Sequence, residues 1–374
     1  MRESGPPANA TQATDAILPG DNGQAMKSAL ITGVCGQDGS YLARHLLARG
    51  YRVLGTHRPG AAPDRWRLRE LGIDGHARLS LKPFGFEGLE RASELLAESG
   101  AREVYNLAAQ SSSVDAASDP VGTARVNALG ALQWLEAARR SGTAVRVCQA
   151  GSAEVFGPSS ESPQDEDTAL SPEGPYAVAK AFAHWSVIDY RRLHGVFAVS
   201  ALLYNHESPL RGAGFVTRKI AQAIVAMRLG DCDWVPVGDL DAVRDWGFAG
   251  DFVDGMWRML QDDAPDTFVL ATGRTHTVRD LVQKCANAAG IDLVWSGRGN
   301  DEVGTERVSG RIRVRVDPSL LRPRAASPRV GNAARAHRRL GWRATTSFDE
   351  LCRMMVEAEF ARFGQGARAR RSDV

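Results

Sequence analysis

The sequence predicts an α/β fold in which a Rossmann-type doubly wound parallel sheet carries a smaller C-terminal lobe. Three observations predict it. From residue 29 to about residue 200, short apolar runs alternate with amphipathic stretches of helical length. A glycine-rich loop, residues 33–39, follows the first apolar run. Beyond residue 201 the alternation loosens. Strands separated by helices of this length form right-handed βαβ units, which build a parallel sheet.

The elements are expected in a regular order along the chain. The apolar runs predict strands at residues 29–32, 53–56, 78–81, 103–108 and 145–150. The amphipathic stretches predict helices at residues 39–49, 88–99, 120–141 and 174–194, with a further amphipathic stretch between the second and third strands. In the second lobe, helices are expected at residues 216–229, 278–289 and 348–360, and Gly/Pro turns at 208–214, 236–240 and 297–304.

These elements divide the chain into four segments. Residues 1–26 are rich in Gly, Pro, Ala and polar residues without periodicity, so we expect a disordered tail. Met26 directly precedes the first apolar run, and an extension ahead of a start at this methionine is one explanation of the tail. Residues 27–200 are expected to bind a nucleotide cofactor and residues 201–360 to form a substrate-binding lobe, with the chain free to cross between them. Residues 361–374 are expected to form a basic tail.

Composition excludes several classes of partner. The chain has 374 residues with 46 Lys and Arg against 44 Asp and Glu, a net charge of +2 that does not favour nucleic acid. No stretch approaches the ~20 apolar residues of a membrane span, so no membrane partner is expected. The five cysteines are scattered without CxxC or zinc-like spacing, which predicts no metal site and reduced thiols in the cytoplasm.

The glycine-rich loop is the first candidate functional segment. Gly33, Gly36 and Gly39 are spaced G-x-x-G-x-x-G, with Gln37 and Asp38 between the second and third. Glycines allow a tight turn in which backbone N–H groups at the start of a helix approach a pyrophosphate. The position between the first strand and the first helix therefore predicts a dinucleotide site.

The second strand indicates which dinucleotide is bound. An acidic residue there binds the adenosine ribose of NAD, whereas this chain has Arg58 and no acid beside it. We expect NADP, with NAD not excluded and an exposed loop arginine as the alternative for Arg58. After the fourth strand come Leu107, Ala109, Gln110 and Ser111, where small residues leave room for nicotinamide or ribose. Close packing of a strand against a helix explains the same residues equally well.

Tyr176 and Lys180 lie four residues apart in a predicted helix, and Ser152 ends the preceding strand. An ammonium on the same helix face can lower the pKa of a phenol, and the serine hydroxyl can bond the same substrate oxygen. This set suits hydride removal from a secondary alcohol. An exposed i,i+4 pair is the alternative. Glu154, two residues after the serine, predicts proton transfer at carbon, unless it is a surface loop acid.

At this point the sequence resembles the extended short-chain dehydrogenase/reductase family, and within it the GDP-mannose 4,6-dehydratases. The resemblance covers nearly all of residues 27–358. It runs through the segments ALITGVCGQDGSY, EVYNLAAQS, PYAVAKA, NHESP, FVTRKI and VRDWG. NHESP followed by FVTRK is a far more specific signature than the glycine loop.

The resemblance implies a cycle of internal oxidation and reduction. Hydride leaves C4 of the hexose for NADP while Tyr176 accepts the C4 hydroxyl proton, bridged by Ser152 where the family usually has Thr. Glu154 then removes the C5 proton and protonates the departing C6 hydroxyl. Hydride returns to C6 and gives a 4-keto-6-deoxy sugar with no net redox change. Related 4-epimerases usually carry a small residue in place of Glu154, so this carboxylate favours dehydration.

The resemblance also implies the binding residues. These are Asn205 and Lys219 for the nucleotide sugar, Arg244 and Arg322 for its phosphates or base, and His206 and Arg211 for cofactor or substrate. Ser111 is expected to contact both ligands, and a structural histidine is the alternative for His206. A homodimer and a homotetramer are both compatible with the family, because the loop after the second strand, which helps to join dimers, is shortened here at Pro59 and Gly60.

Other departures fall around the cofactor and the sugar: Gly85-Phe86 where the family has Asp-Leu, and Gly122 where it has Tyr. Three hypotheses follow. The first is a GDP-mannose 4,6-dehydratase. The second is a dehydratase or epimerase of another GDP-sugar, such as a GDP-heptose. The third is a non-catalytic NADP-binding regulator, which has no need of the complete set Ser152, Glu154, Tyr176 and Lys180.

Overall fold

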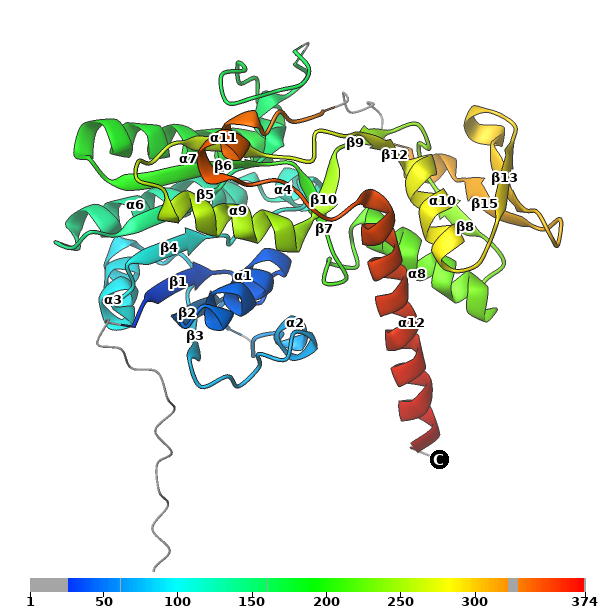
Figure 1. Ribbon diagram of the computed structural model, residues 1–374, viewed down its shortest axis with the longest axis horizontal. Helices are drawn as coiled ribbons and strands as arrows, with labels where there is room; N and C mark the ends of the chain where they lie inside the picture. Colours follow the sequence, from blue (N-terminus) through cyan, green and yellow to red (C-terminus); the bar gives the residue numbers. More distant parts are fainter. Residues whose placement is uncertain (1–25, 61, 160, 322–328, 373–374) are drawn as a thin grey trace, which may run out of the picture.

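A computed structural model describes residues 26–372 apart from residues 61, 160 and 322–328. The expected disordered tail, residues 1–25, and Arg322 lie outside the described residues. Figure 1 shows a large sheet flanked by helices and a smaller lobe beside it, from which helix α12 extends. Among the described residues, no helix is both long enough and apolar enough to cross a membrane.

The large sheet is parallel and has seven strands in the order β11-β6-β5-β4-β1-β2-β3. Its strands are β1 Ser28–Thr32, β2 Arg52–His57, β3 Leu79–Pro83, β4 Glu103–Asn106, β5 Arg146–Ala150, β6 Phe197–Leu203 and β11 Thr267–Leu270. The first six follow the doubly wound order, whose direction reverses between β1 and β4. The predicted fold class is therefore confirmed. Ligands of such sheets bind beyond the carboxyl ends of the strands at this reversal.

Helices cover both faces of the sheet. The first face carries α1 Gln37–Ala48 and α9 Ala249–Gln261, which pack together and bury Leu46 and Met256. The second face carries α3 Leu89–Ser99, α6 Gly130–Arg140 and α7 Gly174–His194, which bury Leu95 and Trp134. Helix α9 and strand β11 were not predicted. They belong to the large sheet although they follow residue 201.

The predicted helix 120–141 is divided into three parts. It begins as α5 Pro120–Ala124, continues as a π-helix at Arg125–Leu129, and ends as α6. A short unpredicted helix, α4 Ser113–Ser118, precedes it. The π-helical turn buries Asn127, whose amide bonds the backbone of Gln110 in both directions, at 2.9 and 3.0 Å. A tertiary contact thus accompanies the break in the regular helix.

The second lobe has its own core. It consists of α8 Val216–Leu229, α10 Val278–Ala288, α12 Phe348–Ser372 and a sheet of order β13-β14-β15-β8. The sheet strands are β8 Val235–Val237, β13 Leu293–Ser296, β14 Val303–Glu306 and β15 Ile312–Val316. Two predicted turns are partly wrong: Pro236 lies within β8, and residues 303–304 begin β14. Segment 361–374, expected to be a basic tail, is helical as far as Ser372.

Short elements connect the two lobes. Strands β7 Asn205–Glu207 and β10 Trp246–Phe248 pair in parallel, and β9 Val243–Arg244 pairs antiparallel with β12 His276–Thr277. The remaining helices are α2 Trp66–Glu70, in the stretch between the second and third strands, and α11 Ala334–Leu340. The pairing of β7 with β10 places Asn205 beside Trp246, so residues from both lobes meet near the ends of the sheet strands.

Candidate active site

The glycine loop is a closely packed turn between β1 and α1. Gly33 has φ +69°, and a Cβ there would lie 3.0 Å from the Cα of Ala108. A Cβ on Gly39 would overlap the carbonyl oxygen of Gly33, which in turn accepts a 2.9 Å hydrogen bond from Gly36 N. Side chains would push these segments apart. The loop therefore needs its glycines, as a backbone cradle for a pyrophosphate does.

Gln37 and Asp38 use their side chains to join this loop to β7. Gln37 Nε2 donates to the carbonyl oxygen of His206 at 3.0 Å, and Ser208 Oγ donates to Gln37 Oε1 at 2.8 Å. Asp38 Oδ2 lies 2.9 Å from His206 Nε2. These side chains hold the loop in place. Their backbone N–H groups, at the start of α1, point to the dinucleotide site that the sequence predicts.

Asp38 and His206 each favour the charged form of the other. Burial alone would raise the pKa of Asp38, but the charge and hydrogen bond of His206 outweigh it and lower this pKa to about 2. Burial lowers the pKa of His206, but Asp38 and the carbonyl of Tyr204 outweigh it and raise this pKa above its ordinary value. His206 Nδ1 lies 2.7 Å from the Tyr204 carbonyl oxygen. Both ring nitrogens of His206 thus face acceptors. These contacts are the ones expected of a structural histidine, the alternative role for this residue.

A buried chain of amide and hydroxyl groups lies under the site, and no sequence pattern predicted it. Thr32 Oγ1 donates to Asn106 Oδ1 at 2.8 Å and accepts from the N–H groups of residues 107 and 108 at 2.9 Å. Asn106 Nδ2 donates to Gln149 Oε1 at 2.7 Å, and Gln149 Nε2 donates to the Ala150 carbonyl at 2.9 Å. The ends of β1, β4 and β5 are therefore fixed relative to one another.

The residues expected after the fourth strand form a loop, since β4 ends at Asn106. Leu107, Ala109 and Gln110 are half-buried there, and Ser111 is exposed. Thr32 and Asn127 hold the backbone at both ends of the loop. Such a surface beside the glycine loop suits a flat ring.

The region expected to receive the adenosine lies at the ends of β2 and β3. Arg58 is exposed just beyond β2. In the loop after β3, the two carboxylate oxygens of Glu87 accept from Gly85 N at 3.0 Å, and a Cβ on Gly85 would lie 2.8 Å from the ring of Pro59. Phe86 has φ +62° and packs on Phe84 with ring centres 4.8 Å apart. Apolar side chains therefore lie near Arg58, where the family resemblance implied an Asp-Leu pair at residues 85 and 86.

The four candidate catalytic residues come from the end of β5 and the start of α7. Ser152 precedes a short 3₁₀ turn, Ala153–Phe156, and its Oγ accepts from Glu154 N at 3.2 Å. Lys180 is 3% exposed and donates to the Ala150 carbonyl oxygen at 2.8 Å. Its ammonium nitrogen is 5.8 Å from the centre of the Tyr176 ring. The structure brings the four together.

The electrostatics of the pair differ from the expectation. Burial lowers the pKa of Lys180 to about 8. Burial also raises the pKa of Tyr176 to about 12, opposed by a hydrogen bond from Ser152 and reinforced by the charge of Glu154. The expected lowering of the phenol pKa is therefore wrong for the protein alone, because desolvation disfavours phenolate more than its neighbours stabilise it.

Sequence reasoning missed the residue in closest contact with Glu154. Arg329 Nη1 lies 2.6 Å from Glu154 Oε1, and Arg329 Nε donates to the Gly157 carbonyl at 3.3 Å. The two residues are far apart in the sequence, and an isolated arginine after a Pro-rich stretch carries no recognisable pattern.

The expected substrate residues are only partly grouped. Arg211 pairs with the buried Glu207 at 3.0 Å and stacks over Phe215 at 3.6 Å. Asn205 is exposed on β7. Arg244 lies two residues before Trp246, the pairing partner of Asn205, and it is half-buried. Lys219 is exposed on α8 and, among the described residues, forms no side-chain hydrogen bond or ion pair with the other candidates.

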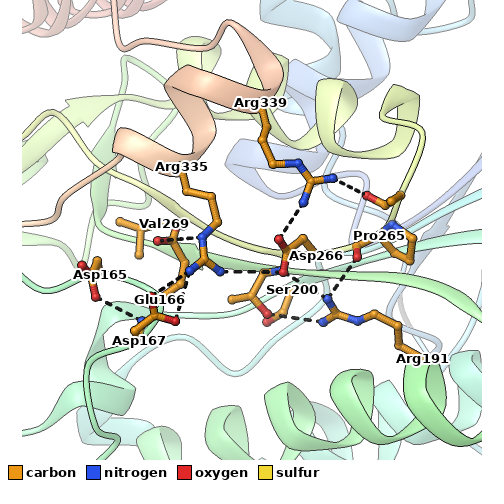
Figure 2. Close-up of polar contacts among 12 residues, drawn as sticks. Asp165, Glu166, Asp167, Arg191, Ser200, Pro265, Asp266, Val269, Arg335 and Arg339 are labelled. Atoms are coloured by element: carbon orange, nitrogen blue, oxygen red, sulfur yellow. Dashed lines mark hydrogen bonds and ion pairs between the residues drawn. The ribbon is translucent and has the colours of Figure 1, made fainter.

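A separate hollow of about 500 Å³ lies elsewhere, between the outer side of α7, residues 166–170 and Arg335. Figure 2 shows its ion pairs: Arg335 reaches Glu166, Asp167 and Asp266, and Arg339 and Arg191 also reach Asp266. These contacts join α11 to β11 and α7. None of the candidate site residues that the structure describes lines this hollow, so geometry and chemistry place the candidate site at the strand ends instead.

The chain is similar in sequence to known proteins. The family model described as GDP-mannose 4,6 dehydratase matches residues 30–355. A GDP-mannose 4,6 dehydratase of Cricetulus griseus is 40% identical over 351 residues, covering 91% of this chain and 93% of the relative. A GDP-mannose 4,6-dehydratase of Yersinia enterocolitica is 40% identical over 360 residues, covering 91% and 96%.

Solved structures agree on the fold. The dTDP-glucose 4,6-dehydratase DesIV of Streptomyces venezuelae, with NAD bound, is 22% identical with a TM-score of 0.74 and covers 90% of this chain and 98% of its own. RMD of Pseudomonas aeruginosa, complexed with NADPH, is 22% identical with a TM-score of 0.71, covering 90% and 100%. At these identities the likeness concerns the fold. The family model and the sequence relatives go further, and by them this chain belongs to the GDP-mannose 4,6-dehydratase family.

Proposed function

We propose that this protein is a GDP-mannose 4,6-dehydratase, a lyase that converts GDP-mannose to GDP-4-keto-6-deoxymannose and water. The observation that carries the proposal is the grouping of Glu154 with Ser152, Tyr176 and Lys180 beside the glycine loop. A simple alcohol oxidation needs three of these residues. The carboxylate adds the group that an elimination at C5 and C6 requires.

We propose NADP as the cofactor, with NAD as the alternative. The tight turn at Gly33, Gly36 and Gly39 fits a bound pyrophosphate, because a Cβ at residue 33 or 39 would fill the turn. Arg58 offers its exposed guanidinium to a 2′-phosphate. When bound, NADP supplies the hydride acceptor for the oxidation and the hydride donor for the final reduction. On this proposal residues 27–200 hold the cofactor and the second lobe holds the nucleotide sugar.

In the oxidation, Tyr176 takes the proton of the C4 hydroxyl and Ser152 bonds the same oxygen. A phenol with a pKa of about 12 is a weak acid at neutral pH, so its ionisation needs a nearby positive charge. Lys180 is held close by its bond to the Ala150 carbonyl. The positive charge of an oxidised nicotinamide adds to the same effect.

In the elimination, Glu154 takes the proton from C5, which the C4 ketone has made acidic. The C–O bond at C6 then breaks, the same carboxyl group returns a proton to the leaving hydroxyl, and water departs. Glu154 therefore ends the step in its starting ionised state. The elimination leaves a double bond between C5 and C6. Hydride addition at C6, with return to C5 of the proton that Tyr176 took from the C4 hydroxyl, completes the 4-keto-6-deoxy sugar, and the ketone at C4 remains.

The binding of the nucleotide sugar is assigned to polar residues between the lobes. Arg244 suits a diphosphate through bidentate bonds, and Asn205 lies near it through the pairing of β7 with β10. Lys219 on α8 is the most distant of the set. His206 contacts Asp38 and so joins β7 to the cofactor loop, and Arg211 pairs with Glu207 at the end of the same strand.

We also propose that the protein forms a homodimer through α7 and α5, with a tetramer as the alternative. Exposed large apolar side chains of these elements include Val178, Phe182 and Trp185 on α7 and Val121 on α5. Residues three and four apart on a helix share one face, and α5 packs on α7, so the patch is continuous. Exposed apolar patches of this kind mark protein interfaces. Trp185→Glu should halve the mass measured by analytical ultracentrifugation.

We propose a cytoplasmic location as well, because the three free thiols buried in the cores suit a reducing compartment.

One experiment tests the proposed activity. The purified protein is incubated with GDP-mannose, and the sugar nucleotide is followed by mass spectrometry. Loss of one water without net consumption of NADP is expected. Unchanged GDP-mannose, together with dehydration or epimerisation of another GDP-sugar, would refute the assigned substrate and favour the second hypothesis.

A further inference from the structure

We propose that Arg329 is a positioning residue that holds the carboxylate of Glu154 at the place where the elimination occurs. This inference rests on the proposed function. Glu154 is 46% exposed in its side chain, whereas that of Arg329 is 15% exposed. An exposed glutamate samples many rotamers. The 2.6 Å contact to a mostly buried guanidinium restricts it to one region of the site.

The contact leaves the carboxylate available for chemistry. It is made through Glu154 Oε1. A carboxylate has two oxygens, so one can be held while the other faces the sugar. The guanidinium does not exchange protons near neutral pH, and it therefore cannot replace Glu154 as the acid or base. Its effect on the reaction passes through Glu154.

Arg329 is itself well anchored at its side chain and its backbone. Its Nε donates to the Gly157 carbonyl at 3.3 Å, directly after the turn that carries Glu154. The next residue, Val330, accepts from Gln164 N at 2.9 Å, and Asn332 N donates to the Gln164 carbonyl at 2.8 Å. A β-bridge thus fixes the backbone that follows the arginine.

A buried carboxylate connects this backbone to the sugar site. Asp245 is fully buried, and its oxygens accept from Gly331 N at 3.3 Å and from the backbone of Thr272 and Gly273 at 3.0 Å. It directly follows Arg244. A Cβ on Gly331 would overlap Ala271, so this segment packs closely against its neighbours. The arginine that holds Glu154 and the arginine assigned to the diphosphate are therefore linked by a hydrogen-bonded frame.

The frame has a specific consequence for the reaction sequence. Glu154 must first reach the proton on C5 and then deliver a proton to the oxygen on C6, so its placement matters for the elimination alone. The oxidation at C4 depends on Tyr176, which has no contact with Arg329 among the described residues. Loss of Arg329 should slow water loss and leave the oxidation rate unchanged.

The test is a single-turnover comparison of full-length variants with GDP-mannose. For Arg329→Gln, reduced nicotinamide should form at the wild-type rate, while water loss, followed by mass spectrometry, falls about 10²-fold, the loss expected for a misplaced catalytic group. The 4-keto hexose that still carries its C6 hydroxyl should accumulate. Arg329→Lys should restore part of the rate, because it keeps the charge without the second donor to Gly157.

Arg339→Gln is the matched control, since Arg339 also pairs with carboxylates but has no contact with Glu154. The Arg339→Gln variant should catalyse water loss from GDP-mannose at the wild-type rate. Wild-type water loss in Arg329→Gln would overturn the inference. An equal fall of both steps would overturn it as well, because it would indicate a general structural role. Inactivity of the wild type toward GDP-mannose would instead refute the proposed substrate, and the same comparison would use the GDP-sugar that the wild type converts.

Discussion

The ammonium nitrogen of Lys180 lies 5.8 Å from the centre of the Tyr176 ring, and burial shifts the pKa of each residue in the direction that favours its neutral form. The pKa of Lys180 falls to about 8 and that of Tyr176 rises to about 12. Near neutral pH the protein therefore holds a buried charged lysine and a protonated tyrosine. A bound cofactor and substrate have to supply the remaining driving force for proton removal.

Lys180→Met should stabilise the protein near neutral pH while abolishing activity. The folded pKa of about 8 lies below the ordinary value of 10.5, so the unfolded chain binds the proton more tightly and folding is opposed by about 3 kcal/mol below pH 8. The lost bond to the Ala150 carbonyl offsets about 1 kcal/mol of the gain, because Gln149 Nε2 still donates to that oxygen. Urea unfolding should show a net gain of about 2 kcal/mol at neutral pH that fades as the pH rises toward 10.5. A variant less stable than wild type near pH 7 would contradict this account.

Glu154→Gln should block water loss. The amide keeps the shape of the carboxyl group but cannot take the C5 proton, and general acid–base catalysis contributes about 10² to 10⁴ in rate. Mass spectrometry should find little dehydrated product, while reduced nicotinamide still forms after mixing with GDP-mannose. Glu161→Gln, an exposed acid just beyond the same turn, is the control and should behave as wild type. Elimination by Glu154→Gln at the wild-type rate would show that another group moves the proton.

Ser152→Ala should move the pH dependence of the oxidation. The serine hydrogen bond is the main contact that lowers the pKa of Tyr176, so its removal raises this pKa further. The rise of kcat/KM with pH should shift to more alkaline values, and the rate near neutral pH should fall about 10-fold, as for loss of one strong hydrogen bond. Ser152→Thr keeps the hydroxyl and should retain the wild-type profile. An unchanged profile in Ser152→Ala would exclude this hydrogen bond from the proton transfer.

The contributions of Asp38 and His206 to the free energy of unfolding should depend on each other. Asp38 has a lowered pKa, so its contribution is present above its ordinary pKa of 3.8 and is lost as the pH falls toward 2. His206 has a raised pKa, so its contribution is present below its ordinary 6.5 and is lost as the pH rises through the folded value. A double-mutant cycle of Asp38→Asn and His206→Gln, measured by urea unfolding near pH 6, should give a coupling energy of about 1–3 kcal/mol. Additive effects would mean that the two residues act independently.

Much of the fold was readable from local patterns. Apolar runs gave the first five strands, and helix α7 begins and ends at the predicted residues because Pro175 stands in its first turn and Gly195 ends it in a left-handed conformation. Helix α9 and strand β11 were missed, since their positions in the large sheet depend on a chain that returns from the second lobe. Local sequence patterns also could not predict the interruption of the helix at Asn127, because there a side chain bonds the backbone of Gln110, 17 residues earlier in the chain.

The candidate site shows the same division. Ser152, Tyr176 and Lys180 were predictable because their spacing on one strand end and one helix carries the chemistry. Arg329 was not, because only the folded chain brings it to Glu154. The phenol pKa was predicted in the wrong direction, because the sequence gives the neighbouring charge but not the degree of burial.

Gly39→Ala should weaken NADP binding more than it weakens the fold. A methyl group there would overlap the Gly33 carbonyl oxygen and lie 2.7 Å from the Cα of Val34, so the turn between β1 and α1 must open. The backbone N–H groups at the start of α1 would then move away from the pyrophosphate position, and each lost charge-assisted hydrogen bond is worth about 1.5–3 kcal/mol. Calorimetric titration with NADP should therefore show at least about a 10-fold weaker Kd. Gly214→Ala is the matched control, because a Cβ on Gly214 would meet no atom within 4 Å. Wild-type affinity in Gly39→Ala would mean that the cofactor is held elsewhere, and the assignment of residues 33–39 to the pyrophosphate would fail.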